Sequence, residues 1–116
     1  MLVFSDTARI LLFTGATDMR KGFDGLAALV SAAGENVYSG DLFVFVSRRR
    51  NLAKLVGFRK GGLVLVCMRL DRGSFKIHLP HSEDRAELDN IQLTMLLDGI
   101  DFARVRRPEH WKPKLT

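Results

Sequence analysis

The chain of 116 residues contains little cysteine, proline or tryptophan: one cysteine, three prolines and one tryptophan. A single cysteine excludes an internal disulfide framework and a zinc site built from cysteines. The longest apolar run, Leu63–Met68, is six residues, whereas a membrane-spanning helix needs roughly 20. No apolar signal-peptide region follows the first ten residues, which include Asp6 and Arg9. We therefore expect a cytoplasmic protein without a membrane segment.

What the chain does contain is typical of one globular domain. Hydrophobic residues make up 47% and charged residues 27%, close to the averages of globular proteins. We assign residues 1–103 to a single domain. Residues 104–116 carry five bases against Glu109, together with Pro108 and Pro113. Such a composition predicts a basic, flexible C-terminal tail.

Hydrophobic periodicity and turn residues predict an α+β domain with the element order β-α-β-β-β-β-α. The expected strands are Arg9–Thr14, Leu42–Val46, Ala53–Phe58, Leu63–Leu70 and Phe75–Leu79. The segment 59–62, with two glycines between two apolar runs, predicts a tight hairpin. Because short turns join four consecutive strands, we expect an antiparallel meander. Cys67 lies in the most apolar of these strands and is expected to be a small buried side chain.

Two helices are expected, each with its own start and stop signals. Thr17 and Asp18 offer cap oxygens ahead of apolar residues spaced by three and four, and Gly34 ends that pattern. Asp89 and Gln92 have the spacing of a capping box, and this second helix ends near Gly99. Two short helices can cover one face of a sheet. The second apolar face would then need a partner protein, a second copy or closure into a small barrel.

Positive charge is concentrated in the middle of the chain. The net charge is +5, yet residues 48–76 alone hold nine bases against Asp71. This density suits a phosphate-facing surface, because the planar guanidinium of arginine pairs with two phosphate oxygens at once. A basic face that is only solvated is the alternative. The candidate DNA-binding residues are Arg48, Arg49, Arg50, Lys54, Arg59, Lys60, Arg69 and Arg72.

Catalytic and cofactor signatures are missing from the sequence. The serines lie in no nucleophile elbow, and the glycines fit neither phosphate-binding fingerprint. His81 near Glu83 and Asp84 could hold a metal ion, but this mixture is common in ordinary loops. We therefore expect no enzyme activity, no catalytic residue, no metal and no cofactor. No zinc finger, helix-turn-helix or RNA-binding aromatic signature accompanies the basic block, so sequence-specific readout is not expected.

Five strings, taken together, resemble a known family. They are Thr17–Leu26, Gly40–Phe45, Arg48–Arg50, Leu70–Phe75 and Gln92–Asp101. Their order and spacing are similar to those of the TnpB accessory protein (Orf2-like) of the insertion sequence 66 family of bacterial transposons. The most specific string is the first, which reads TDMRKGFDGL.

The resemblance implies a small accessory protein encoded beside a separate, larger transposase, with no catalytic residues of its own. Two functions follow from it. The first, which the charge density favours, is phosphate-directed binding of DNA, such as transposon ends, through the arginine-rich block within a transposase complex. The second is a protein-interaction module that docks on the transposase or on another accessory protein without specific DNA binding. Whether the protein is a homodimer stays open.

Overall fold

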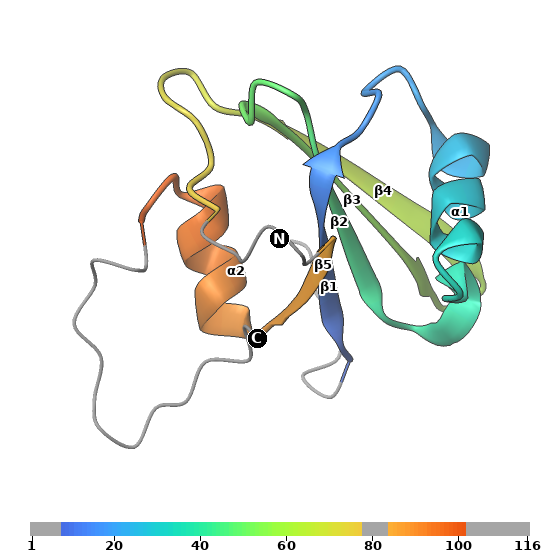
Figure 1. The fold of residues 1–116 in the computed structure, drawn as a ribbon. Helices are drawn as coiled ribbons and strands as arrows, with labels where there is room; N and C mark the ends of the chain where they lie inside the picture. The colour runs from blue at the N-terminus through green and yellow to red at the C-terminus, as the bar shows by residue number, and fades with distance from the viewer. Residues whose placement is uncertain (1–7, 78–83, 102–116) are drawn as a thin grey trace.

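A computed structural model describes residues 8–77 and 84–101 of the chain (Figure 1). The tail expected at residues 104–116 lies outside these ranges. The elements, in chain order, are β1 (Ile10–Ala16), α1 (Phe23–Ala32), the 3-10 helix η1 (Val37–Ser39), β2 (Leu42–Val46), β3 (Leu52–Arg59), β4 (Gly62–Arg69), β5 (Arg85–Leu88) and α2 (Asn90–Leu97). The α+β class and the order of strands and helices agree with the sequence prediction. Within the described ranges, no helix combines the length and the apolar character needed to cross a membrane.

The sheet is mixed, so the expected antiparallel meander is only partly right. Its five strands lie in the order β4-β3-β2-β1-β5. Strands β2, β3 and β4 form an antiparallel meander, but β1 and β2 run parallel, with Leu11 opposite Phe43. A parallel pair requires a crossover connection of a dozen or more residues. Residues 17–41, which contain α1, supply that crossover.

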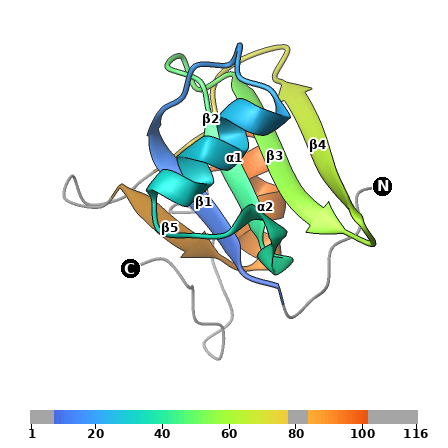
Figure 2. The same ribbon diagram turned by 90° about the vertical axis from the view of Figure 1, so that its right-hand side faces the viewer.

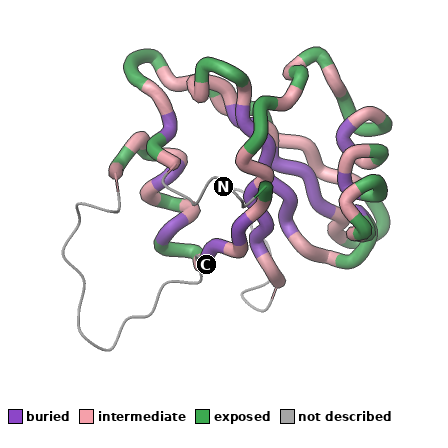
Figure 3. The backbone as a smooth tube through the Cα atoms, in the orientation of Figure 1, coloured by how far each residue is buried: buried purple, intermediate pink, exposed green. Residues whose placement is uncertain are grey.

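The two helices lie on opposite faces of the sheet, which corrects the expectation that both cover one face (Figure 2). On one face, Leu26 and Val30 of α1 pack against Phe43 and Phe45 of β2. On the other face, Leu96 of α2 belongs to a second core that includes Val44. All five residues of β2 are buried as a result, and the buried segments run through the middle strands in Figure 3. Each apolar face of the sheet is therefore covered by a helix of the same chain.

The fifth strand is not the segment that alternation predicted. Phe75 and Ile77 lie in an irregular segment, and residues 78–79 fall outside the described ranges. Phe75 nevertheless is 1% exposed and packs in the core beside α2. Its backbone N–H donates to the carbonyl of Arg50 at 2.6 Å. The strand that completes the sheet is β5, which pairs antiparallel with β1, Leu88 facing Ile10.

The start of α1 differs from the prediction, whereas the start of α2 confirms it. Helix α1 begins at Phe23 after Gly22, which offers no side-chain cap, so Thr17 and Asp18 do not cap it. The capping box of α2 is present, with the Asp89 carboxylate accepting from the Gln92 N–H at 2.7 Å. The Gln92 side chain accepts in return from the Asp89 N–H at 2.9 Å.

An ion-pair cluster ties the start of β1 to the segment that enters β2. The guanidinium of Arg9 donates to Asp41 at 3.0 Å and also pairs with Glu35. Burial raises the pKa of Asp41, but hydrogen bonds from the backbone and side chain of Arg9 and from Ser39 lower it further, so the pKa lies below its ordinary value. The carboxylate thus gains stabilisation on folding only in its charged form.

We expect the Asp41 carboxylate to make stability acid-sensitive. Because its pKa is lower in the folded state, its contribution is present above the unfolded value of about 4 and disappears as pH falls through the folded value. Asp41→Asn should lower the free energy of unfolding at neutral pH and approach the parent protein in acid, as measured by urea unfolding at several pH values. Asp24→Asn, an exposed change on α1, is the control. A difference in the free energy of unfolding between Asp41→Asn and the parent protein that stays constant as pH falls would contradict this assignment.

Candidate nucleic-acid interface

The turn between β2 and β3 presents the first two candidate arginines to solvent. Its geometry is fixed by Ser47, whose side-chain oxygen accepts from the N–H groups of Asn51 at 3.3 Å and Leu52 at 3.1 Å. The Ser47 carbonyl also accepts from the Arg50 N–H at 2.9 Å. Arg48 and Arg49 lie within this closed turn and are exposed. A rigid turn lowers the entropy cost of presenting two long side chains together.

Strand pairing brings a third arginine to the same end of the sheet. Arg69, the last residue of β4, lies opposite Leu52, the first residue of β3. A shallow cavity of about 440 Å³ opens between the three arginines and the segment that follows β1. Its lining residues are Thr17, Met19, Ser47, Arg48, Arg49, Asn51, Leu52 and Arg69. The loop after β1, the β2–β3 turn and the segment after β4 lie together at the top of Figure 1.

Arg72 belongs to the same end, in the turn that follows β4. The chain there is anchored on the β2–β3 turn, because the Leu70 N–H donates to the Asn51 carbonyl at 2.8 Å and the Phe75 N–H donates to the Arg50 carbonyl. Arg72 is exposed between these two anchors. We call Arg48, Arg49, Arg69 and Arg72 the basic end.

Two other candidates at this end take part in holding the fold. The Lys54 ammonium donates to the Lys21 carbonyl at 2.7 Å, which fastens the loop after β1 onto β3. The Arg50 guanidinium donates to the Ile77 carbonyl at 3.4 Å, and Arg50 adopts a left-handed backbone with φ of 56°. Both side chains are half-buried, so they have structural contacts that the sequence did not reveal.

The remaining candidates, Arg59 and Lys60, lie at the opposite end of the sheet. Arg59 is the last residue of β3, and Lys60 is the first residue of the turn to β4, where Lys60 and Gly61 have φ of 47° and 89°. These angles fit a two-residue type I′ turn and confirm the predicted hairpin. Since β3 spans eight residues at about 3.3 Å per residue, roughly 23 Å separate the two groups. The block that is continuous in the sequence is therefore divided in space.

Within the described residues, the basic end differs from Arg9, Arg20 and Arg85 in its lack of acidic partners. Arg9 pairs with Glu35 and Asp41, Arg20 with Asp18, and Arg85 with Asp84. The Arg20 guanidinium and backbone N–H hold the pKa of Asp18 well below its usual range. In contrast, the four guanidinium groups of the basic end form no hydrogen bond or ion pair with any residue of the ranges 8–77 and 84–101. Their donors are available to an anion.

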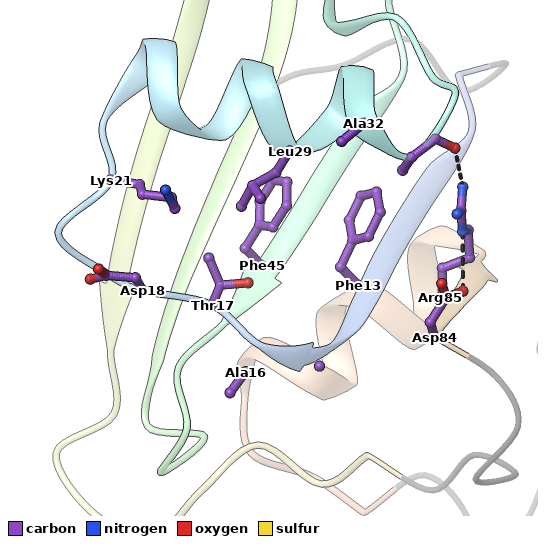
Figure 4. A pocket seen from close by; sticks show the side chains of 12 residues that line it. Phe13, Ala16, Thr17, Asp18, Lys21, Leu29, Ala32, Phe45, Asp84 and Arg85 are labelled. Atoms are coloured by element: carbon purple, nitrogen blue, oxygen red, sulfur yellow. Dashed lines mark hydrogen bonds and ion pairs between the residues drawn. The ribbon is translucent and has the colours of Figure 1, made fainter.

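Sequence reasoning missed a second cavity, of about 430 Å³, between α1 and the sheet (Figure 4). On its floor, the rings of Phe13 and Phe45 stack with centroids 4.9 Å apart. The Arg85 guanidinium lies 5.6 Å from the Phe13 centroid and donates to the Ala33 carbonyl at 2.7 Å. The sequence could have indicated this aromatic pair only if β1 and β2 had been known to be neighbours. Since its arginine already has partners, we assign no ligand to it.

No metal centre emerges from the part of the chain that the structure describes, where no three histidine, cysteine or acidic residues are grouped to hold an ion. His81 and Glu83 of the metal alternative weighed from the sequence lie outside that part. Cys67 is exposed on β4 rather than buried, which corrects the sequence expectation. The reason is the position of β4 at the edge of the sheet.

Comparison with known proteins gives one family and two similar curated proteins. The family model described as IS66 Orf2 like protein matches residues 8–107. The uncharacterized protein y4hO of Sinorhizobium fredii is 40% identical over 97% of this chain and 96% of its own length. The uncharacterized protein y4jC of the same organism is 32% identical over 90% of each chain. No solved structure matches the chain significantly.

Proposed function

This chain belongs to the IS66 Orf2-like family, and we propose that it is an accessory protein of transposition that binds DNA through its basic end within a transposase complex. The family is associated with an insertion sequence, which supplies the transposition context. The proposed partners are DNA, held through its phosphates, and the transposase of the same element, which would supply any preference for the ends of the element. We propose no catalytic step for this chain.

The observation that carries the proposal is a group of four guanidinium groups at one end of the sheet that have no partner among the described residues. The arginines that stabilise this fold have partners within it, as Arg9 has in Asp41. Each guanidinium of the basic end can instead donate two parallel hydrogen bonds to a phosphate. Contacts of this kind fix the position of a protein on DNA and carry no base sequence. The expected role is to hold and position DNA rather than to read it.

The competing function, docking on the transposase through an uncovered apolar sheet face, loses that surface in this fold. Helix α1 covers one face with Leu26 and Val30, and α2 covers the other with Leu96. A protein-interaction role would have to use another part of the surface, such as the edge of the sheet. We therefore keep DNA binding as the first proposal.

Binding of the purified full chain to a labelled duplex, measured across a salt series, tests the proposal. Four phosphate contacts predict a slope of about −3.6 in a plot of log affinity against log salt, which is a loss of about 100-fold between 50 and 200 mM. A transposon-end duplex and an unrelated duplex of the same length should bind with similar affinity, because phosphate contacts do not distinguish them. Binding that is weak and gone near physiological salt for both duplexes would instead favour the protein-interaction function.

A further inference from the structure

Strand β4 forms one edge of the sheet, and its outer side pairs with no strand of the described residues. Figure 2 shows it beyond the area that α1 and α2 cover. In a two-residue hairpin the residues that flank the turn exchange both hydrogen bonds, so Gly62, and every second residue after it, bonds to β3. The backbone N–H and carbonyl groups of Leu63, Leu65 and Cys67 therefore point outward, where they can accept another strand.

This edge lacks the features that usually protect an exposed strand from pairing. Such features are charged side chains, prolines, β-bulges or very short length. Strand β4 is eight residues long and pairs with β3 in unbroken register from Arg59–Gly62 to Leu52–Arg69. Its residues 63–68 carry no charge and no proline, and all of them are only half-buried or exposed. The opposite edge, β5, is four residues long and carries Arg85 and Glu87.

The charges around β4 indicate what kind of strand it accepts. Arg59 and Lys60 lie at its first end, and Arg69 and Arg72 at its last, and Asp71 is the one acidic residue in the stretch 59–72. A second copy paired antiparallel would place Arg69 beside the partner's hairpin tip, where like charges repel. A segment with acidic residues at both ends would instead be attracted at both ends.

We propose that the outer edge of β4 binds an extended segment of a partner protein, about six apolar or alternating residues with acidic residues at both ends, as an added strand. Main-chain hydrogen bonds from Leu63, Leu65 and Cys67 supply the pairing, and the flanking charges select the partner. This surface lies along the sheet edge and its proposal does not depend on DNA binding.

Amide hydrogen exchange of the full chain tests this proposal with a defined probe. The probe is a ten-residue peptide with alternating valine and threonine in its middle and two glutamates at each end; the control peptide carries lysines in place of the glutamates. We expect the acidic peptide to slow exchange at Leu63, Leu65 and Cys67, and the lysine peptide to bind about tenfold or more weakly. The amides of Val64 and Val66, already bonded to β3, should change little.

Leu65→Pro removes one outward N–H and should abolish the slowing of amide exchange by the acidic peptide. Leu65→Val keeps the N–H and should retain this slowing. Three results would overturn the proposal: no protection at millimolar acidic peptide, equal binding of the two peptides, or protection of these amides without peptide together with a doubled mass in solution. The last would show that a second copy occupies the edge. The parent protein alone decides between these outcomes if the proline variant does not fold.

Discussion

Replacing Arg48 and Arg49 together by alanine should weaken duplex binding by about 100-fold at low salt, since each lost charge-assisted hydrogen bond contributes about 1.5 kcal/mol. Both side chains are exposed on a turn that is held by Ser47 and the backbone, so the fold should be unaffected. The salt slope should fall by about two, one for each phosphate contact removed. Fluorescence anisotropy with a labelled duplex measures both quantities, and thermal unfolding checks the fold.

The matched control is the double replacement of Arg59 and Lys60 by alanine. It also removes two positive charges, but from the β3–β4 hairpin at the opposite end of the sheet. If the basic end holds the DNA, this control should lose only a fewfold in affinity through the weaker overall field. Equal losses in the two double variants would show that binding follows net charge rather than a site, and the proposed interface would be wrong.

Phe75→Ala should cause the largest loss of stability among single changes near the site, about 3–5 kcal/mol. Phe75 is 1% exposed and fills the core between the sheet and α2. It also anchors the segment of Arg72 on the β2–β3 turn through its N–H bond to the Arg50 carbonyl. The measurement is urea unfolding at neutral pH, compared with the parent protein.

Phe23→Ala provides the control for that measurement, because the ring is 46% exposed on the first turn of α1. A surface change of this kind should alter the free energy of unfolding by about 0.5 kcal/mol or less. A similarly small loss for Phe75→Ala would mean that the segment after β4 contributes little to the core, and that it does not hold Arg72 in place.

Local features of the fold could be predicted from the sequence because neighbouring residues determine them. The type I′ turn needs Lys60 and Gly61 at positive φ, and a glycine between two apolar runs indicates it. The capping box needs only Asp89 and Gln92 three positions apart. The parallel pairing of β1 and β2 was missed, although a helix between two strands is the usual signal of such a crossover.

Other features depend on contacts between distant residues, which alternation does not encode. Phe75 and Ile77 alternate like a strand, yet β1 takes β5 as its neighbour, a segment of four residues too short and too charged to stand out. The candidate site shows the same limit. The density of bases pointed to the arginines, but the length of β3 moves Arg59 and Lys60 away from Arg48 and Arg49. Arg50 donates to the Ile77 carbonyl and Lys54 donates to the Lys21 carbonyl. These hydrogen bonds distinguish both residues from the four arginines of the basic end.

The position of β1 between β2 and β5 has a consequence for how the chain folds during synthesis. Strands β2, β3 and β4 can pair as soon as each follows the last, but the pairs Phe13–Arg85 and Ile10–Leu88 join residues that are far apart in the sequence. Loop closure over such a span slows folding, because its entropy cost precedes the contacts that repay it. We expect the nascent chain to carry an open edge on β1 until residues 85–97 have left the ribosome, when β5 and α2 dock as the last step.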